Sequence, residues 1–484
     1  MKVKTGTPAY AAQAATLLIL ALLSLSCVGC AGVATTRESV NFGAPAETAT
    51  PTAELAGSTV SNITRMAPPT GTPAAGGMAT VDSGPQAEAA ASRPAATATW
   101  PAGSDEVPCG VLLPILPADQ ALTDHLTPGG PALELVPDAA LPALERLIAA
   151  PETVGLAAFE IGRESDGAYL NPDAPMPLAS VVKIINLIAY AEAVAAGGLD
   201  PAEWIPLSEL ERSFLRRTDL GAHARALDGL EERRLIAMDP PATPLEEIPW
   251  MMIRHSSNAA ADYIHLRLGQ TAIEQTAVEL GLDSQTAPCP WIGQFLMMAN
   301  RQSSTNNRGT IQSYLDEPEE YGREAMRLAE SYASDQDFRQ AESSPGWRVP
   351  VTTQALFSDN LNAQASARDY AGLMARILRN ELSSDYTNIV VRRALEWPML
   401  FPQNQELFTA IGLKDGSLPG VLTTAYYAQR AEDGAQLVVV LFFRQLSRNT
   451  YRQWRQDLPH DEFARWLLSD PAAIPTLRET LRAD

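Results

Sequence analysis

A serine and a lysine stand three residues apart at the start of a strongly apolar segment. Ser180 and Lys183 open the run from Ala179 to Ala195, which predicts a buried helix. Residues three apart share a helix face, so the hydroxyl and the amine can meet. A lysine in a buried, electropositive pocket loses its proton readily and can then activate a hydroxyl as a nucleophile. The alternative for this pair alone is a capping serine followed by a lysine that reaches solvent.

A second cluster, from His255 to Ala260, lies in a turn between two helical segments. Ser256 and Asn258 are two residues apart, so a turn can direct both side chains into one cleft. Ser256 could relay a proton between Lys183 and a leaving group, and Asn258 could bond a substrate amide. A helix-capping Ser/Asn cluster explains the same residue types without any chemistry.

A third cluster follows the predicted strand Phe408–Leu413. Lys414 supplies a cation, and Gly416 permits close approach of a ligand to the backbone. The N–H of Ser417 could pair with that of Ser180 as an oxyanion hole. A simple hairpin turn is the alternative.

Lysine is rare in this chain, which adds weight to two of these clusters. Lys183 and Lys414 are the only lysines beyond Lys2 and Lys4, and arginine carries the remaining positive charge. Arginine stays protonated and cannot act as a base, whereas lysine can lose its proton. The sequence therefore predicts a need for an amine at both positions.

The order and spacing of the three clusters resemble those of the penicillin-recognising serine hydrolases, the class A β-lactamases and their DD-peptidase relatives. The resemblance extends over about 141–468. It implies acyl transfer on β-lactams or, alternatively, on D-Ala-D-Ala-type wall peptides or esters, with no cofactor. Carried over by motif, the resemblance makes Ser180 the nucleophile and Lys183 its base. Ser256 and Asn258 form the second motif, and Lys414 and Gly416 form the third.

Two departures from that family pattern concern the substrate and the rate of hydrolysis. The stretch Cys289–Asn300 matches the loop that carries a water-activating Glu in class A β-lactamases, but it has no carboxylate. The residues Glu317, Glu319 and Glu320 do not match that motif. Asp415 replaces the Thr or Ser whose hydroxyl binds the substrate carboxylate, and Ser417 is a possible substitute. A non-catalytic surface-binding protein is therefore a rival hypothesis.

The order of elements predicts an α+β fold, an α/β sandwich of the β-lactamase/DD-peptidase type, with an antiparallel sheet built from both chain ends. A strand (Val154–Ile161) and a short return (Ala168–Leu170) precede the helical part. A lobe of helices is inserted before three late strands and a closing helix from Asp461. The polar, acidic segment near 303–350 is expected to be an insertion outside the core. Thr243 is expected to cap a helix that runs to Met252.

The N-terminal region predicts export rather than catalysis. Residues 1–30 have a basic start and an apolar run too short to span a bilayer, and they end at Cys27 and Cys30, either of which could be lipidated. Ordinary cleavage and secretion is the alternative. Residues 31–106 are rich in Ala, Thr and Pro, which predicts a disordered tether. We therefore expect an extracytoplasmic protein anchored to the membrane by a lipid.

Residues 107–484 are expected to form the folded hydrolase domain. Its two cysteines, Cys109 and Cys289, would form a disulfide in an oxidising compartment, although two unpaired thiols remain an alternative. The formal charge of −21 argues against nucleic acid as a partner. No His/Cys spacing indicates a metal site.

Overall fold

The computed structural model describes residues 109–110, 132–299, 308–344 and 349–482. Every described residue belongs to one compact unit. The predicted export segment and tether, with Cys27 and Cys30, lie outside the described residues. None of the described helices is long and apolar enough to cross a bilayer.

The central element is a five-stranded antiparallel sheet with the order β2-β1-β10-β9-β8. The two strands from the start of the domain pair with the three from its end, so the predicted α+β fold is confirmed. The strands are β1 (Val154–Glu160), β2 (Ala168–Leu170), β8 (Phe408–Leu418), β9 (Val421–Arg430) and β10 (Gln436–Phe443).

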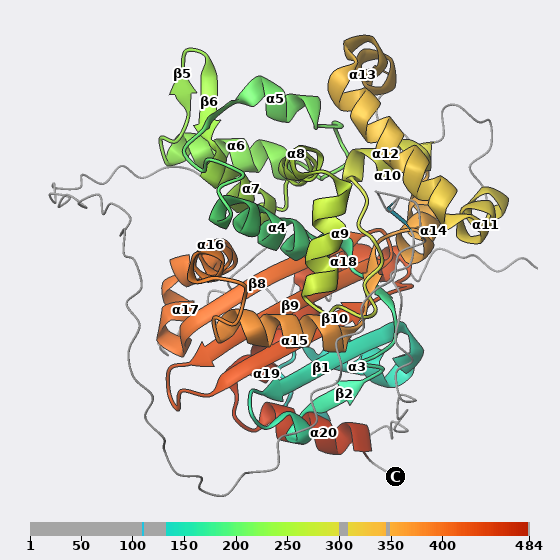
Figure 1. Ribbon diagram of the computed structural model, residues 1–484. Coiled ribbons are helices and arrows are strands. Elements are labelled where there is room, and N and C mark those ends of the chain that lie inside the picture. The colour runs from blue at the N-terminus through green and yellow to red at the C-terminus, as the bar shows by residue number, and fades with distance from the viewer. Residues whose placement is uncertain (1–108, 111–131, 300–307, 345–348, 483–484) are drawn as a thin grey trace, which may run out of the picture. The chain divides into compact units, whose positions relative to one another are not determined.

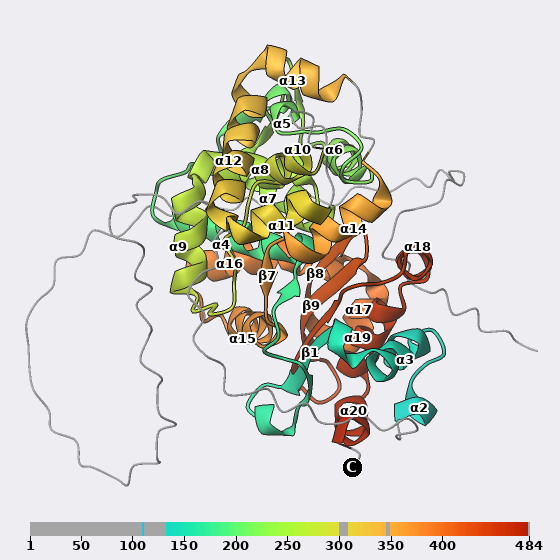
Figure 2. The ribbon, with the colours of Figure 1, turned by 90° about the vertical axis from the view of Figure 1, so that its right-hand side faces the viewer.

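Helices cover both faces of this sheet, which explains why its inner strands are apolar on both sides. Helix α15 (Ala367–Leu378) packs on β1, β9 and β10, whereas α19 (Pro459–Ser469) packs on the opposite face of β9 and β10 (Figures 1 and 2). The other helices that flank the sheet are α2 (Ala132–Leu135), α3 (Leu141–Ala149), α16 (Asp385–Leu395), α17 (Pro402–Leu407), α18 (Arg448–Asp457) and α20 (Ala473–Arg482).

A lobe of helices lies between β2 and β8 in the chain and appears at the top of Figure 1. Its buried centre is α4 (Lys183–Ala195), which contacts α7, α8 and α9. The lobe also holds two small sheets, β3-β7 and β4-β6-β5. The elements are α5 (Leu207–Arg212), α6 (Ala222–Glu232), α7 (Ile248–Arg254), α8 (Asn258–Leu268), α9 (Gln270–Glu279), α10 (Trp291–Ala299), β3 (Met176–Pro177), β4 (Trp204–Pro206), β5 (Ala237–Met238), β6 (Pro241–Pro244) and β7 (Gln364–Ala365).

The acidic segment that follows α10 is helical, and it is more than a surface appendage. Helix α12 buries one face, including Tyr321 and Ala329, against α10. The two helices touch at Gly293, where a Cβ would lie 2.0 Å from the Ala325 carbonyl oxygen. The expectation of a segment outside the core was therefore wrong for α12. Its elements are α11 (Arg308–Asp316), α12 (Pro318–Ser334), α13 (Gln336–Ser343) and α14 (Val351–Asn360).

Two local expectations differ from the structure. Thr243 lies in β6, opposite Ile205, rather than at a helix N-cap, because Pro241 and Pro244 at the ends of this strand favour extended backbone. Strand β8 continues past Leu413 to Leu418, so the third cluster lies inside a strand and not in a turn. Continued pairing with β9 keeps it extended.

Candidate functional site

Ser180 lies in a single 3₁₀ turn, η3 (Ala179–Val182), that leads directly into α4. The preceding residue, Ala179, has φ +46°, a left-handed conformation that is uncommon for a residue with a side chain. Its N–H donates to Asn362 Oδ1 at 2.9 Å, and the N–H of Leu178 donates to the Ala363 carbonyl at 2.8 Å. These two bonds fix the sharp bend that presents Ser180, which is partly exposed.

Lys183, the first residue of α4, is completely buried and holds the turn that carries the second cluster. Its Nζ donates to the Ser256 carbonyl oxygen and to Asn258 Oδ1, both at 2.7 Å, and lies 3.4 Å from Ser256 Oγ. Ser256 itself has φ +62°. The first and second clusters therefore meet, as their order in the sequence predicted.

Lys414 approaches the same hydroxyl from the sheet. Its side chain is fully buried, and its Nζ donates to Ser256 Oγ at 3.2 Å. The same amine donates to the Asp415 carbonyl oxygen at 2.7 Å and to Asp415 Oδ1 at 3.1 Å. Ser256 Oγ thus lies between the two buried lysines, and all three clusters form one site.

The surroundings of Lys183 favour its neutral form. Burial lowers the pKa of Lys183 well below its usual value, and the positive charge of Lys414 lowers it further. Asp219, Asp262 and Asp415 act in the opposite direction but do not outweigh these effects. The ring of Trp291 covers the amine, with 5.0 Å between Nζ and the ring centroid. These surroundings make the neutral form of the Lys183 amine easier to reach than in water.

Strand β8 is an edge of the sheet, and it lies directly against the Ser180 turn. A Cβ on Gly416 would lie 2.8 Å from Ser180 N and 2.3 Å from Thr423 Oγ1, so only glycine allows this contact. The Asp415 carbonyl faces Lys414 and the cleft. Backbone groups two residues apart on a strand point to the same side, so the Ser417 N–H also faces this edge.

The hydroxyl of Ser417 does not take part in the cleft. It is bonded at 2.8 Å to the hydroxyl of Tyr451, on α18. The side chain of Asp415, by contrast, is 57% exposed. Desolvation acts to raise the pKa of Asp415, but the charge of Lys414 and its hydrogen bond prevail and lower that pKa. The third cluster therefore exposes a carboxylate, not a hydroxyl, one residue before Gly416, which lies against Ser180.

Asp262 positions the helix that covers Lys183. Its carboxylate accepts hydrogen bonds from the N–H groups of Trp291 and Ile292, both at 2.7 Å, at the start of α10. Burial raises the pKa of Asp262 to about 7, while these amides and Lys183 act to lower it. Sequence reasoning missed Asp262, although it lies on the same helix as Asn258.

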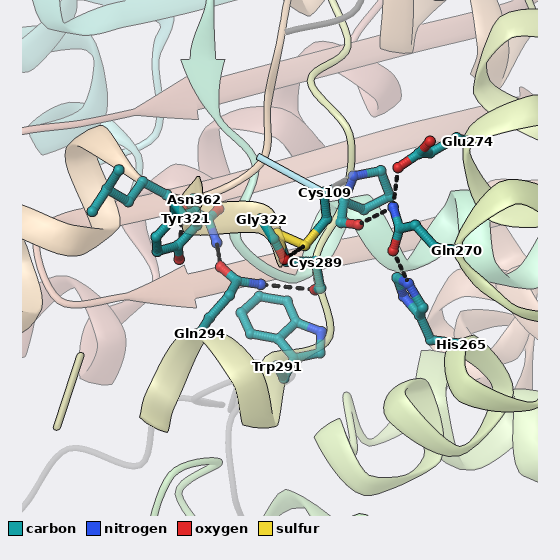
Figure 3. Close-up of a disulfide and its surroundings, with 12 residues drawn as sticks. Cys109, His265, Gln270, Glu274, Cys289, Trp291, Gln294, Tyr321, Gly322 and Asn362 are labelled. Atoms are coloured by element: carbon teal, nitrogen blue, oxygen red, sulfur yellow. Dashed lines mark hydrogen bonds between the residues drawn. A yellow bond between two sulfur atoms is a disulfide. The ribbon is translucent and has the colours of Figure 1, made fainter. Parts of the chain in front are cut away.

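A disulfide joins Cys109 to Cys289 just before α10. Figure 3 shows the hydrogen bonds that link Cys289, Gln294 and Asn362 beside this bond. Gln294 Nε2 donates to the Cys289 carbonyl at 2.9 Å, and Asn362 Nδ2 donates to Gln294 Oε1 at 3.3 Å. Because Asn362 Oδ1 in turn holds the N–H of Ala179, the bonds form a continuous path from the disulfide to the Ser180 turn.

A buried histidine, His223, contacts the residue that follows Ser256 in the second cluster. His223 Nδ1 lies 3.0 Å from Ser257 Oγ, and its Nε2 lies 3.4 Å from a carboxylate oxygen of Glu211. Ser257 caps α8 through a bond from Ala260 N at 3.2 Å. Fully buried Ser257 is thus a structural neighbour of Ser256. The chain separation between these partners hid the contact from sequence reasoning.

The described part of the chain holds no cluster of three or more His, Cys, Asp or Glu side chains that could bind a metal ion. Helix α10 contains no carboxylate. The acidic residues Glu317, Glu319 and Glu320 lie exposed at the start of α12. Beside the site, a small pocket lies between α10, α14 and the end of β8, where Trp291, Asn362 and Leu418 line it.

The chain is similar to a family model and to several solved structures. Residues 140–458 match a family model described as the beta-lactamase enzyme family. Similar solved structures include a beta-lactamase from Sphaerobacter thermophilus, with 18% identity, a TM-score of 0.41 and coverage of 69% of this chain and 100% of that chain. Another is a beta-lactamase from Chitinophaga pinensis, with 16% identity, a TM-score of 0.40 and coverage of 68% and 99%.

A third similar structure is an acyl-enzyme complex of a PBP-A mutant with penicillin G, with 17% identity, a TM-score of 0.36 and coverage of 71% of this chain and 94% of that chain. No curated protein matches the chain. The family model spans well over half of the sequence and includes all three clusters of the site. On that match, this chain belongs to the beta-lactamase enzyme family.

Proposed function

We propose that the protein is a serine acyl hydrolase that forms an acyl-enzyme through Ser180, with β-lactams as substrates. The observation that carries this proposal is the convergence of the Lys183 and Lys414 amines on Ser256 Oγ, 3.4 Å and 3.2 Å away. Burial and the charge of Lys414 lower the pKa of Lys183, which supports a role for its amine as a base. Membership of the beta-lactamase enzyme family supports the same class of reaction.

In the proposed acylation step, neutral Lys183 takes the proton of the Ser180 hydroxyl as its oxygen attacks the carbonyl carbon. The N–H groups of Ser180 and Ser417 hold the developing oxyanion. The carbon–nitrogen bond of the lactam then breaks, and Ser256 passes the proton from Lys183 to the departing nitrogen. Lys414 orients the Ser256 hydroxyl through its hydrogen bond to Oγ, while the amide of Asn258 bonds the substrate.

Release of the acyl group is proposed to be slow. Helix α10, which covers Lys183, supplies no carboxylate to activate water. Asp262 is fully buried and accepts two backbone hydrogen bonds, which leaves it unsuited to that task. This observation favours the second candidate function, a DD-peptidase, penicillin-binding protein or esterase whose β-lactam adduct persists.

Intact mass spectrometry during incubation with a penicillin tests both candidates. We expect a mass increase of one penicillin on the wild-type protein and none on Ser180→Ala. An adduct that then disappears indicates a β-lactamase, and one that persists indicates penicillin binding. A wild-type protein that never forms the adduct, or Ser180→Ala that labels equally, contradicts the proposal.

A non-catalytic surface protein is the rival from another class, and the exposed carboxylate of Asp415 motivates it. A binding protein has little use for a fully buried amine with a lowered pKa, so Lys183 argues against this rival. Any covalent adduct on Ser180 with an acylating probe excludes it.

We further propose that the protein is exported and anchored to the membrane by a lipid on Cys27 or Cys30, with 31–106 as a spacer. The composition of 1–106 supports this. Expression of Cys27→Ala and Cys30→Ala separately, followed by membrane fractionation, tests it. Release of the protein by one of the two changes is the expected result, and retention by membranes of the double variant contradicts it.

A further inference from the structure

The amine of Lys414 has no N–H left to offer a substrate. A lysine ammonium has three donors. They are directed to Ser256 Oγ at 3.2 Å, to the Asp415 carbonyl oxygen at 2.7 Å and to Asp415 Oδ1 at 3.1 Å. Because Lys414 is completely buried, these bonds are made away from bulk water. The carboxylate of Asp415 therefore occupies the place on this cation that an incoming anion would need.

The same carboxylate is exposed. The Asp415 side chain is 57% exposed, although it bonds a buried lysine. Its neighbour Gly416 lies against Ser180 N, so Asp415 is one strand residue away from the contact with the nucleophile. A substrate bound along the β8 edge with its carbonyl at Ser180 must bring its next substituent close to this negative charge.

The third cluster also offers no free hydroxyl to bind a substrate carboxylate. The Ser417 hydroxyl is already bonded to the Tyr451 hydroxyl at 2.8 Å. Arg254 is a further cation whose interaction with Asp415 is favourable, but its guanidinium stacks on Trp397, 4.1 Å from the ring centroid. That stacking holds Arg254 in place on an aromatic surface.

We propose that this site selects acyl donors whose substituent next to the scissile bond is neutral or cationic, and that it disfavours those with a free carboxylate there. The inference rests on the proposed function, because it concerns the substrate of the Ser180 acyl-enzyme. It narrows the range of substrates. The carboxylate of Asp415 already pairs with Lys414, so a substrate carboxylate must either displace Asp415 from Lys414 or remain unpaired beside Asp415.

Penicillin G and its methyl ester give a direct test, because they differ by one charge and share the reacting lactam. In both, the bond from Ser180 Oγ to the carbonyl carbon forms, the lactam carbon–nitrogen bond breaks, and the nitrogen gains the proton. The rate of adduct formation is measured for each compound by intact mass spectrometry. We expect the wild-type protein to react faster with the ester, by about tenfold or more, since two carboxylates repel each other in a partly buried site.

The variant Asp415→Asn keeps the size of the side chain and removes its charge. The ratio of the ester rate to the acid rate should fall by about tenfold or more in this variant. Any difference in intrinsic reactivity between the two compounds cancels when ratios from the two proteins are compared. Asp433→Asn is the matched control, because Asp433 also pairs with a nearby cation, Arg430, at 2.9 Å. It should leave the ratio unchanged.

The outcomes separate the inference from the function on which it rests. If the wild-type protein forms the Ser180 adduct equally fast with both compounds, or if Asp415→Asn leaves the ratio unchanged, the inference is overturned and the proposed function stands. If neither compound forms a Ser180 adduct, the proposed function falls and the inference falls with it. Should Asp415→Asn fail to fold, Asp415→Ser is compared in the same way.

Discussion

The amine of Lys183 donates to the carbonyl oxygen of Ser256 at 2.7 Å and lies 3.4 Å from the hydroxyl of the same residue. This relationship joins the base to the residue that would relay its proton, and it requires an amine that can become neutral. Lys183→Arg should therefore abolish acylation, because arginine remains protonated.

Lys414→Arg serves as the companion variant. It keeps the positive charge beside Ser256 Oγ, so we expect acylation to weaken and not to disappear. Both rates are measured with a penicillin by mass spectrometry, and folding is checked by circular dichroism. Equal activity in the two folded variants would contradict the different roles given to these lysines.

The pH dependence of acylation should report the pKa of Lys183. The neutral amine is the base, so the rate should rise as the pH rises through this pKa, which lies well below the usual value for lysine. The charge of Lys414 is the second cause of that lowering, after burial. Lys414→Met should therefore raise the pKa of Lys183 and move the midpoint of the profile to higher pH.

Lys414→Arg is the control for this shift, because it retains the charge, and its midpoint should stay close to that of the wild-type protein. The profiles are obtained from initial acylation rates across a pH series at constant ionic strength. If the midpoint moves to lower pH in Lys414→Met, the charge of Lys414 does not lower the pKa of Lys183.

Gly416→Ala should impair both folding and acylation. Its Cβ would lie 2.3 Å from Thr423 Oγ1 and 2.8 Å from Ser180 N, so the strand or the nucleophile turn must move. We expect a loss of about 1–3 kcal/mol in the free energy of unfolding, as is usual for overpacking. Gly372→Ala is the matched control: it lies in α15 with no atom near the added Cβ.

Helix propensity predicts that Gly372→Ala leaves acylation unchanged and raises the free energy of unfolding by up to about 1 kcal/mol. Urea denaturation and the rate of adduct formation are measured for both variants. Unchanged acylation in Gly416→Ala would mean that close contact between β8 and the Ser180 turn is unnecessary.

Trp291→Ala tests the cover over the buried amine. Trp291 is 5% exposed and its ring lies 5.0 Å from Lys183 Nζ. Removal of a buried Trp side chain should cost about 3–5 kcal/mol in the free energy of unfolding. Water admitted to the site should also raise the pKa of Lys183 and shift acylation to higher pH. Trp291→Phe retains an aromatic ring and should show smaller changes in both measurements.

Reduction of the disulfide should weaken the fold. The bond between Cys109 and Cys289 closes a loop with a sequence separation of 180 residues. Loss of such a cross-link costs about 2–5 kcal/mol in the free energy of unfolding. Denaturation of Cys109→Ala is compared with the wild-type protein with and without reductant. A wild-type protein equally stable in both conditions would show that the bond contributes little.

Much of the fold could be predicted because its signals are local. The apolar run that begins at Ala179 and the short apolar run in 437–443 indicated a buried helix and a strand from neighbouring residues alone. The extent of β8 and the role of Thr243 could not be predicted this way. Hairpin pairing with the next strand, β9, keeps β8 extended as far as Leu418, and flanking prolines place Thr243 in β6.

The sequence by itself determined which groups are present for chemistry: a hydroxyl and an amine at helical spacing, a second amine far along the chain, and a carboxylate beside it. Residue type sets what each group can donate, accept or release. Only the tertiary structure decided how Lys183 and Lys414 are used. Burial lowers the pKa of the first, and Asp415 and Ser256 take up the donors of the second. These effects depend on distance and on exclusion of water, which arise only when segments far apart in the chain pack together.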